Sequence, residues 1–425
     1  MISLIYMKIS EVNAKAIKDS RGDDTIEISI TTDVGKFSSS APNGKSRGKF
    51  EAKPYKKSLE GDIDTLKNFS DYFSEDSLEK FEDLRRVEDI VEGNIGANSL
   101  FALESACLKA MAKEKGIEVW QFINSKAKLF PRLVGNCIGG GAHSESRRSA
   151  SPETRAARHT PKSLNSGANT GGKKPDFQEF VLIPDSKSVL KSQNTNKSAK
   201  ANAEIILKNI DENFSKKRND ESAWLTSLDD KKALEVLMDL RVNANDELKI
   251  KMEGGLDIAA SSFFKRKKYH YQNPKLDRIT EEQMFYLSNL IKNFGLFYIE
   301  DPFEENDFES FSKLLKAFSK SLIVGDDLTV TNYVRLEEAI KKKSINGIIV
   351  KPNQTGSLLE VKRVCELAKK NNIKIIFSHR SGETDETILA DLAFGFGADF
   401  FKCGIEGDIR EKKIDRLIEI EAGLN

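Results

Sequence analysis

The sequence predicts an α/β protein: a C-terminal (β/α)8-type, TIM-like barrel preceded by an N-terminal α+β domain. In the last third of the chain, short apolar runs recur at nearly even intervals, and a polar residue follows each run. One β/α unit takes roughly 25 residues, so these runs are expected to be successive barrel strands. Between residues 8 and 40, by contrast, apolar and polar residues alternate with period two, which predicts an antiparallel sheet.

The N-terminal α+β domain is expected to span residues 1–135. Ile26, Ile28 and Ile30 alternate with polar residues, and the sequence Asp33-Val34-Gly35 is typical of a turn between two strands. A helix is predicted from Ser99 to Lys115, because apolar residues recur there at helical spacing and Gly116 follows. The domain is therefore an antiparallel sheet followed by helices.

The barrel domain is expected to span residues 136–425, with strands and helices alternating as a parallel barrel requires. The apolar runs assigned to its later strands are Leu296–Ile299, Leu322–Val324, Gly347–Val350, Ile373–Phe377 and Phe400–Phe401. A representative helix runs from about Glu281 to Asn293, with Thr280 and Gln283 as a capping-box pair.

Two polar stretches interrupt this pattern. Residues 144–172 are rich in Ser, Arg, Gly, Asn and Thr, and they hold too little apolar surface to offset the entropy of ordering them. They are interpreted as a mobile or disordered insertion, although their arginines could contact an anion. Residues 191–200 are interpreted in the same way.

The composition excludes several classes of protein. With 67 basic and 66 acidic residues, the net charge of +1 gives no reason to expect nucleic acid as the main partner. The four cysteines form no CxxC pair, which disfavours a zinc site or a disulfide framework. No signal peptide or run of 18 apolar residues is present, so a cytoplasmic protein without a membrane partner is expected.

Three carboxylates stand where predicted barrel strands end: Asp257, Glu300 and Asp326. Carboxylates without histidine or thiolate favour a hard cation, and Mg²⁺ is the usual choice when waters and a substrate anion complete its shell. Any one of them could instead be a helix cap or a surface group. Because all three follow strands, a shared metal site at the barrel mouth is the preferred interpretation.

Basic groups follow the neighbouring strands. Lys351 and Lys402 each come after an apolar run, and a lysine beside a metal and a second lysine is expected to have a lowered pKa and to act as a base. Each lysine could instead pair with a carboxylate as scaffolding. The segment after the next strand, from Ser378 to Glu383, carries His379, Arg380 and Ser381, a composition suited to holding phosphate.

Five strings of the chain resemble the enolase (phosphopyruvate hydratase) family, in its archaeal or divergent form. They are Asp-Ser-Arg-Gly at 19–22, Leu-Asp-Ile-Ala-Ala-Ser at 256–261, Ile-Glu-Asp-Pro-Phe at 299–303, Gly-Asp-Asp-Leu-Thr-Val-Thr-Asn at 325–332 and Ser-His-Arg-Ser-Gly-Glu-Thr at 378–384. The resemblance runs from about Lys8 to Glu421. It implies a Mg²⁺-dependent enzyme of glycolysis and gluconeogenesis that interconverts 2-phospho-D-glycerate and phosphoenolpyruvate.

The resemblance also implies a role for individual positions. Lys351 matches the base that removes the C2 proton, and Glu221 the acid that protonates the departing hydroxyl. Asp257, Glu300 and Asp326 match the ligands of the first Mg²⁺, and Ser46 a ligand of the second. The positions that match substrate contacts are Gln178, Glu179, His143, His379, Arg380, Ser381 and Lys402.

The chain departs from the family pattern in its loops. Ser222 replaces a usual glycine beside Glu221, at a turn that is expected to need positive φ. Asn43, Arg47 and Phe50 also differ from the common residues of the first loop. These changes keep two alternatives open: a catalytically impaired enolase-like binding or scaffold protein, and an enzyme that abstracts a proton from another acid. Enolases are commonly dimers and sometimes octamers, so a homodimer is expected.

Overall fold

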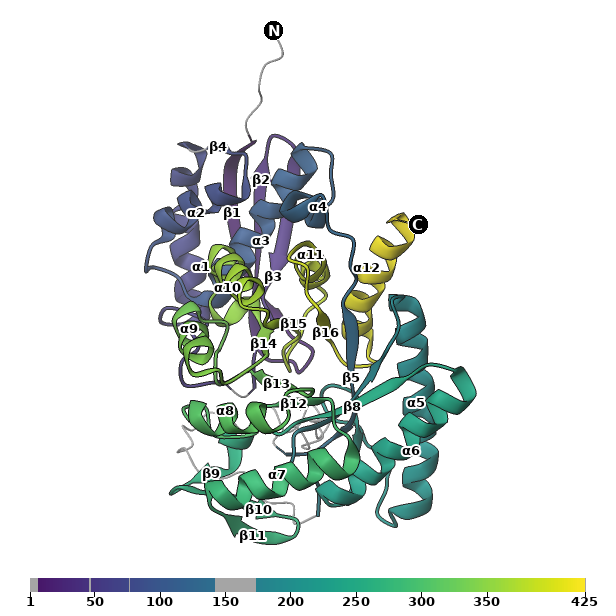
Figure 1. Ribbon diagram of the computed structural model, residues 1–425. Coiled ribbons are helices and arrows are strands. Elements are labelled where there is room, and N and C mark those ends of the chain that lie inside the picture. Colours follow the sequence, from purple (N-terminus) through teal and green to yellow (C-terminus); the bar gives the residue numbers. More distant parts are fainter. Residues whose placement is uncertain (1–6, 46, 76, 142–172, 425) are drawn as a thin grey trace, which may run out of the picture.

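A computed structural model describes residues 7–45, 47–75, 77–141 and 173–424 of the chain. These residues form an N-terminal α+β domain and a C-terminal barrel domain, in agreement with the predicted fold class (Figure 1). Ser46, His143 and the predicted insertion at 144–172 lie outside the described residues.

The N-terminal domain starts with an antiparallel sheet whose strands lie in the order β3-β2-β1-β4. In register, Val12 lies opposite Ile30 and Ala14 opposite Ile28. Ile26, Ile28 and Ile30 are fully buried, so the predicted alternation is confirmed. The strands are β1 (Met7–Lys18), β2 (Asp24–Thr32), β3 (Gly35–Ser40) and β4 (Ser77–Leu78).

Helix α3 (Ala97–Glu114) covers this sheet, with contacts to β2 and β3. It matches the predicted helix within two residues, and Gly116 follows it with φ of +66°, a conformation that suits glycine. The other helical elements of the domain are α1 (Leu59–Asn68), α2 (Leu84–Val91), α4 (Val119–Asn124) and the short 3₁₀ segments η1 (Ser70–Glu75) and η2 (Phe81–Asp83).

The barrel domain is built on a closed sheet. Within the described residues its strands follow the order β16-β15-β14-β13-β12-β8-β6-β5, and β16 pairs with β5 to complete the ring. The strands are β5 (Arg132–Gly139), β6 (Glu179–Pro184), β8 (Met252–Asp257), β12 (Tyr298–Glu300), β13 (Leu322–Gly325), β14 (Gly347–Val350), β15 (Lys374–Ser378) and β16 (Phe400–Lys402). Because β5 begins at Arg132, the expected boundary after residue 135 falls inside a barrel strand.

One strand departs from the expected all-parallel order. β6 runs antiparallel to both β5 and β8, whereas the other neighbours in the ring are parallel. Glu179, the first residue of β6, therefore lies opposite Asp257, the last residue of β8. Reversing this strand brings its first residue to the end of the barrel where its neighbours finish.

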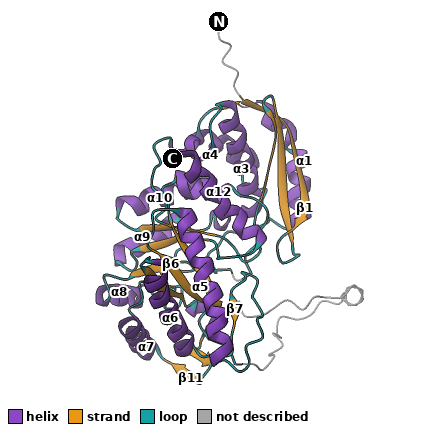
Figure 2. Cartoon of the chain, turned by 90° about the vertical axis from the view of Figure 1, so that its right-hand side faces the viewer, coloured by secondary structure: helices purple, strands orange, loops and turns teal. Residues whose placement is uncertain are grey.

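Helices surround the ring on its outside. They are α5 (Val189–Ile210), α6 (Asp230–Leu248), α7 (Thr280–Phe294), α8 (Phe308–Ala317), α9 (Tyr333–Lys342), α10 (Leu358–Lys370), α11 (Ile388–Gly395) and α12 (Asp408–Leu424). α5 lies alongside α6 and α12 (Figure 2). The N-terminal domain packs against the side of the barrel that carries α10 and α11 (Figure 1).

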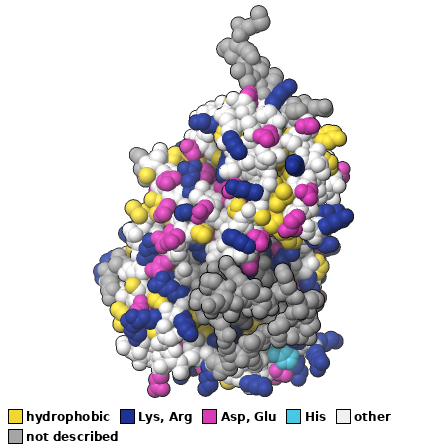
Figure 3. Space-filling model, turned by 180° about the vertical axis from the view of Figure 1, so that it is seen from behind, with side chains coloured by type: hydrophobic (Ala, Val, Ile, Leu, Met, Phe, Trp, Pro, Cys, Tyr) yellow, Lys and Arg dark blue, Asp and Glu magenta, His cyan; other side chains and the backbone are white. Residues whose placement is uncertain are grey.

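Smaller elements complete the barrel domain. β7 (Trp224–Leu225) pairs with the end of β5, and a separate small sheet holds β9 (Phe264–Lys265), β10 (Lys268–Gln272) and β11 (Lys275–Arg278). Two 3₁₀ segments follow barrel strands, η5 (Ala260–Phe263) and η6 (Pro352–Gln354). On the face shown in Figure 3, basic and acidic side chains are interspersed over the described surface.

The prediction for residues 191–200 is wrong, because they form part of α5. Two of their polar side chains are buried against distant partners: Gln193 donates to the carbonyl of Ile405 at 2.7 Å, and Lys200 contacts Glu406 at 2.9 Å. The polar composition gave the wrong prediction because these partners lie more than 200 positions away in the chain.

The predicted capping pair of α7 is also wrong. The backbone N–H of Ile279 donates to Glu282 at 2.9 Å, so the cap lies one residue earlier than expected. Gln283 is buried instead and accepts a hydrogen bond from the Tyr271 hydroxyl at 2.7 Å.

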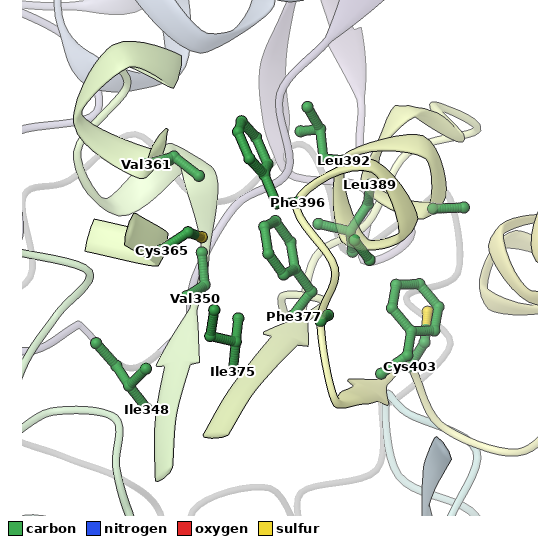
Figure 4. Packing of buried hydrophobic residues seen from close by; sticks show 14 of the residues in the cluster. Ile348, Val350, Val361, Cys365, Ile375, Phe377, Leu389, Leu392, Phe396 and Cys403 are labelled. Carbon is green, nitrogen blue, oxygen red and sulfur yellow. The ribbon is translucent and has the colours of Figure 1, made fainter. Parts of the chain in front are cut away.

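The layer between the barrel strands and α10 and α11 is apolar (Figure 4). Val350 and Phe377 extend from β14 and β15 toward Cys365 of α10 and Leu392 of α11. Phe377 is fully buried, and its ring stacks on Phe396 with the ring centroids 6.2 Å apart. This layer fixes the positions of the strands whose ends carry the polar residues.

We expect Phe377→Ala to lower the free energy of unfolding by about 3 to 5 kcal/mol, because a large cavity would open in this layer. The control is Phe285→Ala on α7, where the ring is 70% exposed and the expected loss is about 0.5 kcal/mol. Equilibrium urea unfolding measures both. Equal losses in the two variants would contradict this account of the core.

Candidate active site

Most of the residues singled out in the sequence meet in one small polar cavity at the mouth of the barrel. It has a volume of about 50 Å³. Both domains contribute to it, since Gly44 of the N-terminal domain lies in its wall. The predicted site residues that line it are Gln178, Glu179, Glu221, Asp257, Asp326, Lys351, His379, Arg380, Ser381 and Lys402.

Lys402 lies at the centre of a cluster of carboxylates. Its ammonium nitrogen lies 2.7 Å from Glu300 Oε2, 2.8 Å from Asp257 Oδ2 and 3.3 Å from Glu179 Oε2. Burial lowers the pKa of Lys402, but the negative charges of Asp257, Glu179 and Glu300 outweigh it and raise that pKa well above its usual value. Lys402 therefore stays charged and offsets part of the negative charge.

The carboxylates of this cluster are held in place by neighbouring groups. Glu300 accepts a hydrogen bond from the Tyr298 hydroxyl at 2.5 Å, and Asp257 accepts one from the Gln178 amide at 3.2 Å. Burial, with the charge of Asp257, raises the pKa of Glu300 to about 8. Ionising all three carboxylates would therefore place more negative charge here than Lys402 alone can neutralise.

A cation would fit this cluster. Glu300 Oε1 is buried without a hydrogen-bond partner among the described residues, so one carboxylate oxygen is left available for a ligand. The surrounding donors are carboxylate oxygens, which suit a hard cation such as Mg²⁺. Of the three metal ligands expected from the sequence, Asp257 and Glu300 lie in this cluster, whereas Asp326 forms an ion pair with Lys351.

A different group of acids has the spacing of a metal site: single oxygens of Asp301, Asp326 and Asp327 lie within 4.8 Å of one another. Asp301, however, already accepts hydrogen bonds from the backbone N–H groups of Asp326 at 3.0 Å and Asp327 at 2.7 Å. We therefore interpret Asp301 as the residue that orients the Asp326 loop. The sequence analysis missed it, although it directly follows Glu300.

Lys351 forms an ion pair with Asp326, and this contact affects the pKa expected for Lys351. Burial lowers the pKa of Lys351, but Asp326 raises it by more, so the pKa lies above its usual value. The predicted lowering of this pKa is wrong for the structure without ligands, because a carboxylate, not a cation, is the nearest charge.

Both domains build the side of the cavity that carries Arg380 and Ser381, the predicted phosphate contacts. Arg380 contacts both oxygens of Glu51, at 3.1 and 3.0 Å, and Ser381 Oγ accepts hydrogen bonds from the backbone N–H of Lys45 at 2.7 Å and from Arg21 at 3.0 Å. A Cβ atom at Gly44 would lie 1.9 Å from the Arg380 guanidinium, so a larger residue there would displace this side chain. The sequence analysis gave no role to Glu51, whose partner lies 329 positions away.

Glu221 also lines the cavity, near His379. Its Oε2 accepts a hydrogen bond from Asn136 at 3.1 Å, and its Oε1 lies 3.6 Å from His379 Nε2. Ser222, which replaces the family's glycine, has φ of +65°, as expected from the turn. The turn is held by Asn219, whose side-chain oxygen accepts hydrogen bonds from two backbone N–H groups, so the serine is accommodated.

Comparison with known proteins identifies the family to which this chain belongs. Residues 161–425 match the family model described as the enolase C-terminal TIM barrel domain. The chain is 33% identical to the enolase of Picrophilus torridus over 98% of this chain and 99% of that protein. The chain belongs to the enolase family. Other members align along almost their whole length as well, at 32% identity for the enolases of Pyrobaculum aerophilum and Methanosphaera stadtmanae.

Membership of this family agrees with the resemblance found in the sequence and with the barrel domain of the structure. Over the described ranges, no helix combines the length and the apolar character needed to cross a membrane.

We expect Lys402→Met to destabilise the protein by about 3 to 5 kcal/mol in the presence of a chelator, because it leaves buried carboxylates without their cation. Added Mg²⁺ should recover part of the loss by taking the place of the ammonium charge. Thermal unfolding with EDTA and with Mg²⁺ measures both effects. Lys374→Met is the control, since the Lys374 side chain is 55% exposed in its pair with Asp399. A Lys402→Met protein as stable as the parent in EDTA would contradict the prediction.

Proposed function

We propose that this chain catalyses the reversible dehydration of 2-phospho-D-glycerate to phosphoenolpyruvate, with Mg²⁺ as its cofactor. The observation that carries the proposal is one cavity that combines a carboxylate cluster, two lysines, an arginine with a serine, and the glutamate Glu221. Proton abstraction from a carbon beside a carboxylate needs a base, an acid and positive charge for the developing anion.

Asp257, Glu300 and Asp326 are the proposed ligands of the tighter Mg²⁺. When bound, this ion supplies positive charge that stabilises the substrate carboxylate as it gains negative charge, and a lysine base working beside Mg²⁺ is the established pattern of the superfamily. A second Mg²⁺ with Ser46 as a ligand remains a prediction, since Ser46 lies outside the described residues.

Lys351 is the proposed base that accepts the C2 proton. Its present partner, Asp326, is also a proposed metal ligand, so the carboxylate that raises the pKa of Lys351 would be shared with a cation in the working enzyme. The positive charges of Arg380 and Lys402 both lower this pKa. Together they favour the neutral amine that a base requires.

Glu221 is the proposed acid that protonates the departing C3 hydroxyl. Asn136 fixes one of its oxygens and leaves the other facing His379 and the cavity. Lys351 and Glu221 come from β14 and from the loop before β7, so they reach the cavity from separate elements. A base and an acid on different sides of a substrate suit an elimination in which proton and hydroxyl leave from adjacent carbons.

Arg380 and Ser381 are the proposed phosphate ligands, and Lys402 the ligand of the substrate carboxylate. Gln178, Glu179 and His379 are proposed to contact the rest of the substrate. The Arg380 guanidinium is hydrogen-bonded to Glu51 in this structure. A bound phosphate would share the guanidinium with Glu51 or displace it. His143 is also proposed to contact the substrate, and it lies outside the described residues.

The rival function is an enolase-like binding or scaffold protein without turnover. Its support was the altered loops, but Ser222 adopts the required turn, and the proposed acid, base and metal ligands within the described residues all meet in or directly beside the cavity. A cytoplasmic homodimer remains our expectation for the working protein.

The proposal is tested by incubating the purified protein with 2-phosphoglycerate and Mg²⁺ and following phosphoenolpyruvate by ultraviolet absorbance. We expect product formation that EDTA stops and that excess Mg²⁺ restores, because the carboxylate cluster is the proposed metal site. Absence of Mg²⁺-dependent product at high enzyme concentration would refute catalysis and favour the binding protein.

Lys351→Ala should lower kcat by at least about 10³-fold, because it removes the proposed base. Lys341→Ala on α9 is the matched control: Lys341 is exposed, and kcat should stay unchanged. Circular dichroism checks that both variants remain folded. Unchanged turnover in folded Lys351→Ala would show that another group takes the proton.

A further inference from the structure

Arg410 lies directly behind His379, in the first turn of α12. It is 3% exposed, and its Nε–H group donates a hydrogen bond to His379 Nδ1 at 3.0 Å. No part of the function described above uses this residue. Arg410 is buried against a residue of the cavity, yet it does not line the cavity itself.

The chemistry of arginine fixes the protonation of the histidine. A guanidinium group only donates hydrogen bonds, so His379 Nδ1 has to be the acceptor and cannot carry a proton. In the neutral imidazole the proton then lies on Nε2. That nitrogen faces Glu221, with Oε1 at 3.6 Å.

The same guanidinium holds the backbone of the proposed phosphate-binding segment. Arg410 Nη2 donates to the carbonyl oxygens of Ser381 at 3.0 Å and Arg380 at 3.4 Å. Gly404 makes room for it: a Cβ atom there would lie 3.1 Å from Arg410 Cδ and 3.8 Å from the His379 ring. One side chain therefore contacts three consecutive residues of the site.

The charges around His379 also keep the ring neutral. Burial is the main cause that lowers the pKa of His379 well below its usual value, and Arg410, Lys402 and Lys351 act in the same direction. Glu221 is the opposing group and raises it. Arg410 is the only one of the three cations with a hydrogen bond to the ring among the described residues.

We propose that Arg410 is a positioning residue: it holds His379 as the neutral Nε2–H tautomer, with this donor facing Glu221, and it fixes the backbone of Arg380 and Ser381. The consequence for catalysis rests on the proposed function, whereas the tautomer does not. His379 then presents one defined donor beside the proposed acid, and the phosphate ligands keep their spacing.

Nuclear magnetic resonance tests the tautomer without any assay of activity. Two-bond ¹H–¹⁵N spectra of protein with ¹⁵N-labelled histidine distinguish Nε2–H from Nδ1–H rings and from doubly protonated rings. His379→Gln identifies the signal among the four histidines of the chain, which are His143, His159, His270 and His379. We expect a neutral Nε2–H ring between pH 6 and 8. An Nδ1–H or doubly protonated ring at pH 7 would overturn the proposal.

Arg410→Met tests the positioning role. Without the guanidinium, His379 is free to take a second proton on Nδ1, so the ring should become doubly protonated at a higher pH than in the parent, although burial, Lys402 and Lys351 still lower its pKa. An added ionisation should appear on the acidic side of the kcat/KM profile. We expect kcat/KM to fall about 10- to 100-fold, with a raised KM for 2-phosphoglycerate as the segment 380–381 loosens. Arg410→Lys keeps a charged hydrogen-bond donor but not the guanidinium fork that also binds the carbonyls of residues 380 and 381. This variant should therefore restore the parent's pH profile more fully than the parent's KM.

Arg416→Met is the matched control, because it makes the same change on the same helix. Arg416 binds Asp391 and Glu118, so stability should fall while the tautomer and the pH profile stay as in the parent. A folded Arg410→Met protein with the parent's tautomer, pH profile and KM would overturn the proposal. If that variant does not fold, the proposal is tested by the NMR measurement of the His379 tautomer in the parent protein. A parent without turnover but with the Nε2–H ring would refute the proposed function and leave the tautomer assignment standing.

Discussion

The placement of several carboxylates around a single ammonium group is the constraint on which the rest of this structure depends. Glu179, Asp257 and Glu300 all face Lys402, and burial together with the neighbouring acids raises the pKa values of Glu179 and Glu300. Buried carboxylates are costly to ionise, and the Tyr298 hydroxyl and the Gln178 amide donate hydrogen bonds to Glu300 and Asp257. If all three acids were ionised, Lys402 alone could not neutralise them, so the cluster would accept a further cation.

This constraint extends into the N-terminal domain. Arg380 would be an uncompensated charge at the barrel mouth, and Glu51 compensates it from the other domain. Asn43 and Gly382 also exchange backbone hydrogen bonds, at 2.7 and 2.8 Å. The contact between the two domains and the predicted phosphate site therefore share residues, and a change in one is expected to alter the other.

Where prediction from the sequence failed, the missing information was a distant partner. The buried polar face of α5 depends on Ile405 and Glu406, more than 200 residues further along the chain. The lowered pKa of Lys351 was predicted for a lysine beside a metal, and the sequence could not show that Asp326 would form an ion pair with it and raise that pKa. Arg410 carried no local signal at all, since it lies in an ordinary amphipathic helix.

The sequence by itself determined the barrel, the antiparallel N-terminal sheet and the residues at the strand ends, because periodicity and strand spacing are local properties of the chain. It also identified the family through short ordered strings of residues. Only the tertiary structure decided the reversed direction of β6, the pairing of Glu51 with Arg380 and the contact of Arg410 with His379. These features depend on which side chains meet after folding, and charge compensation in a buried site is set by such contacts over long separations in sequence.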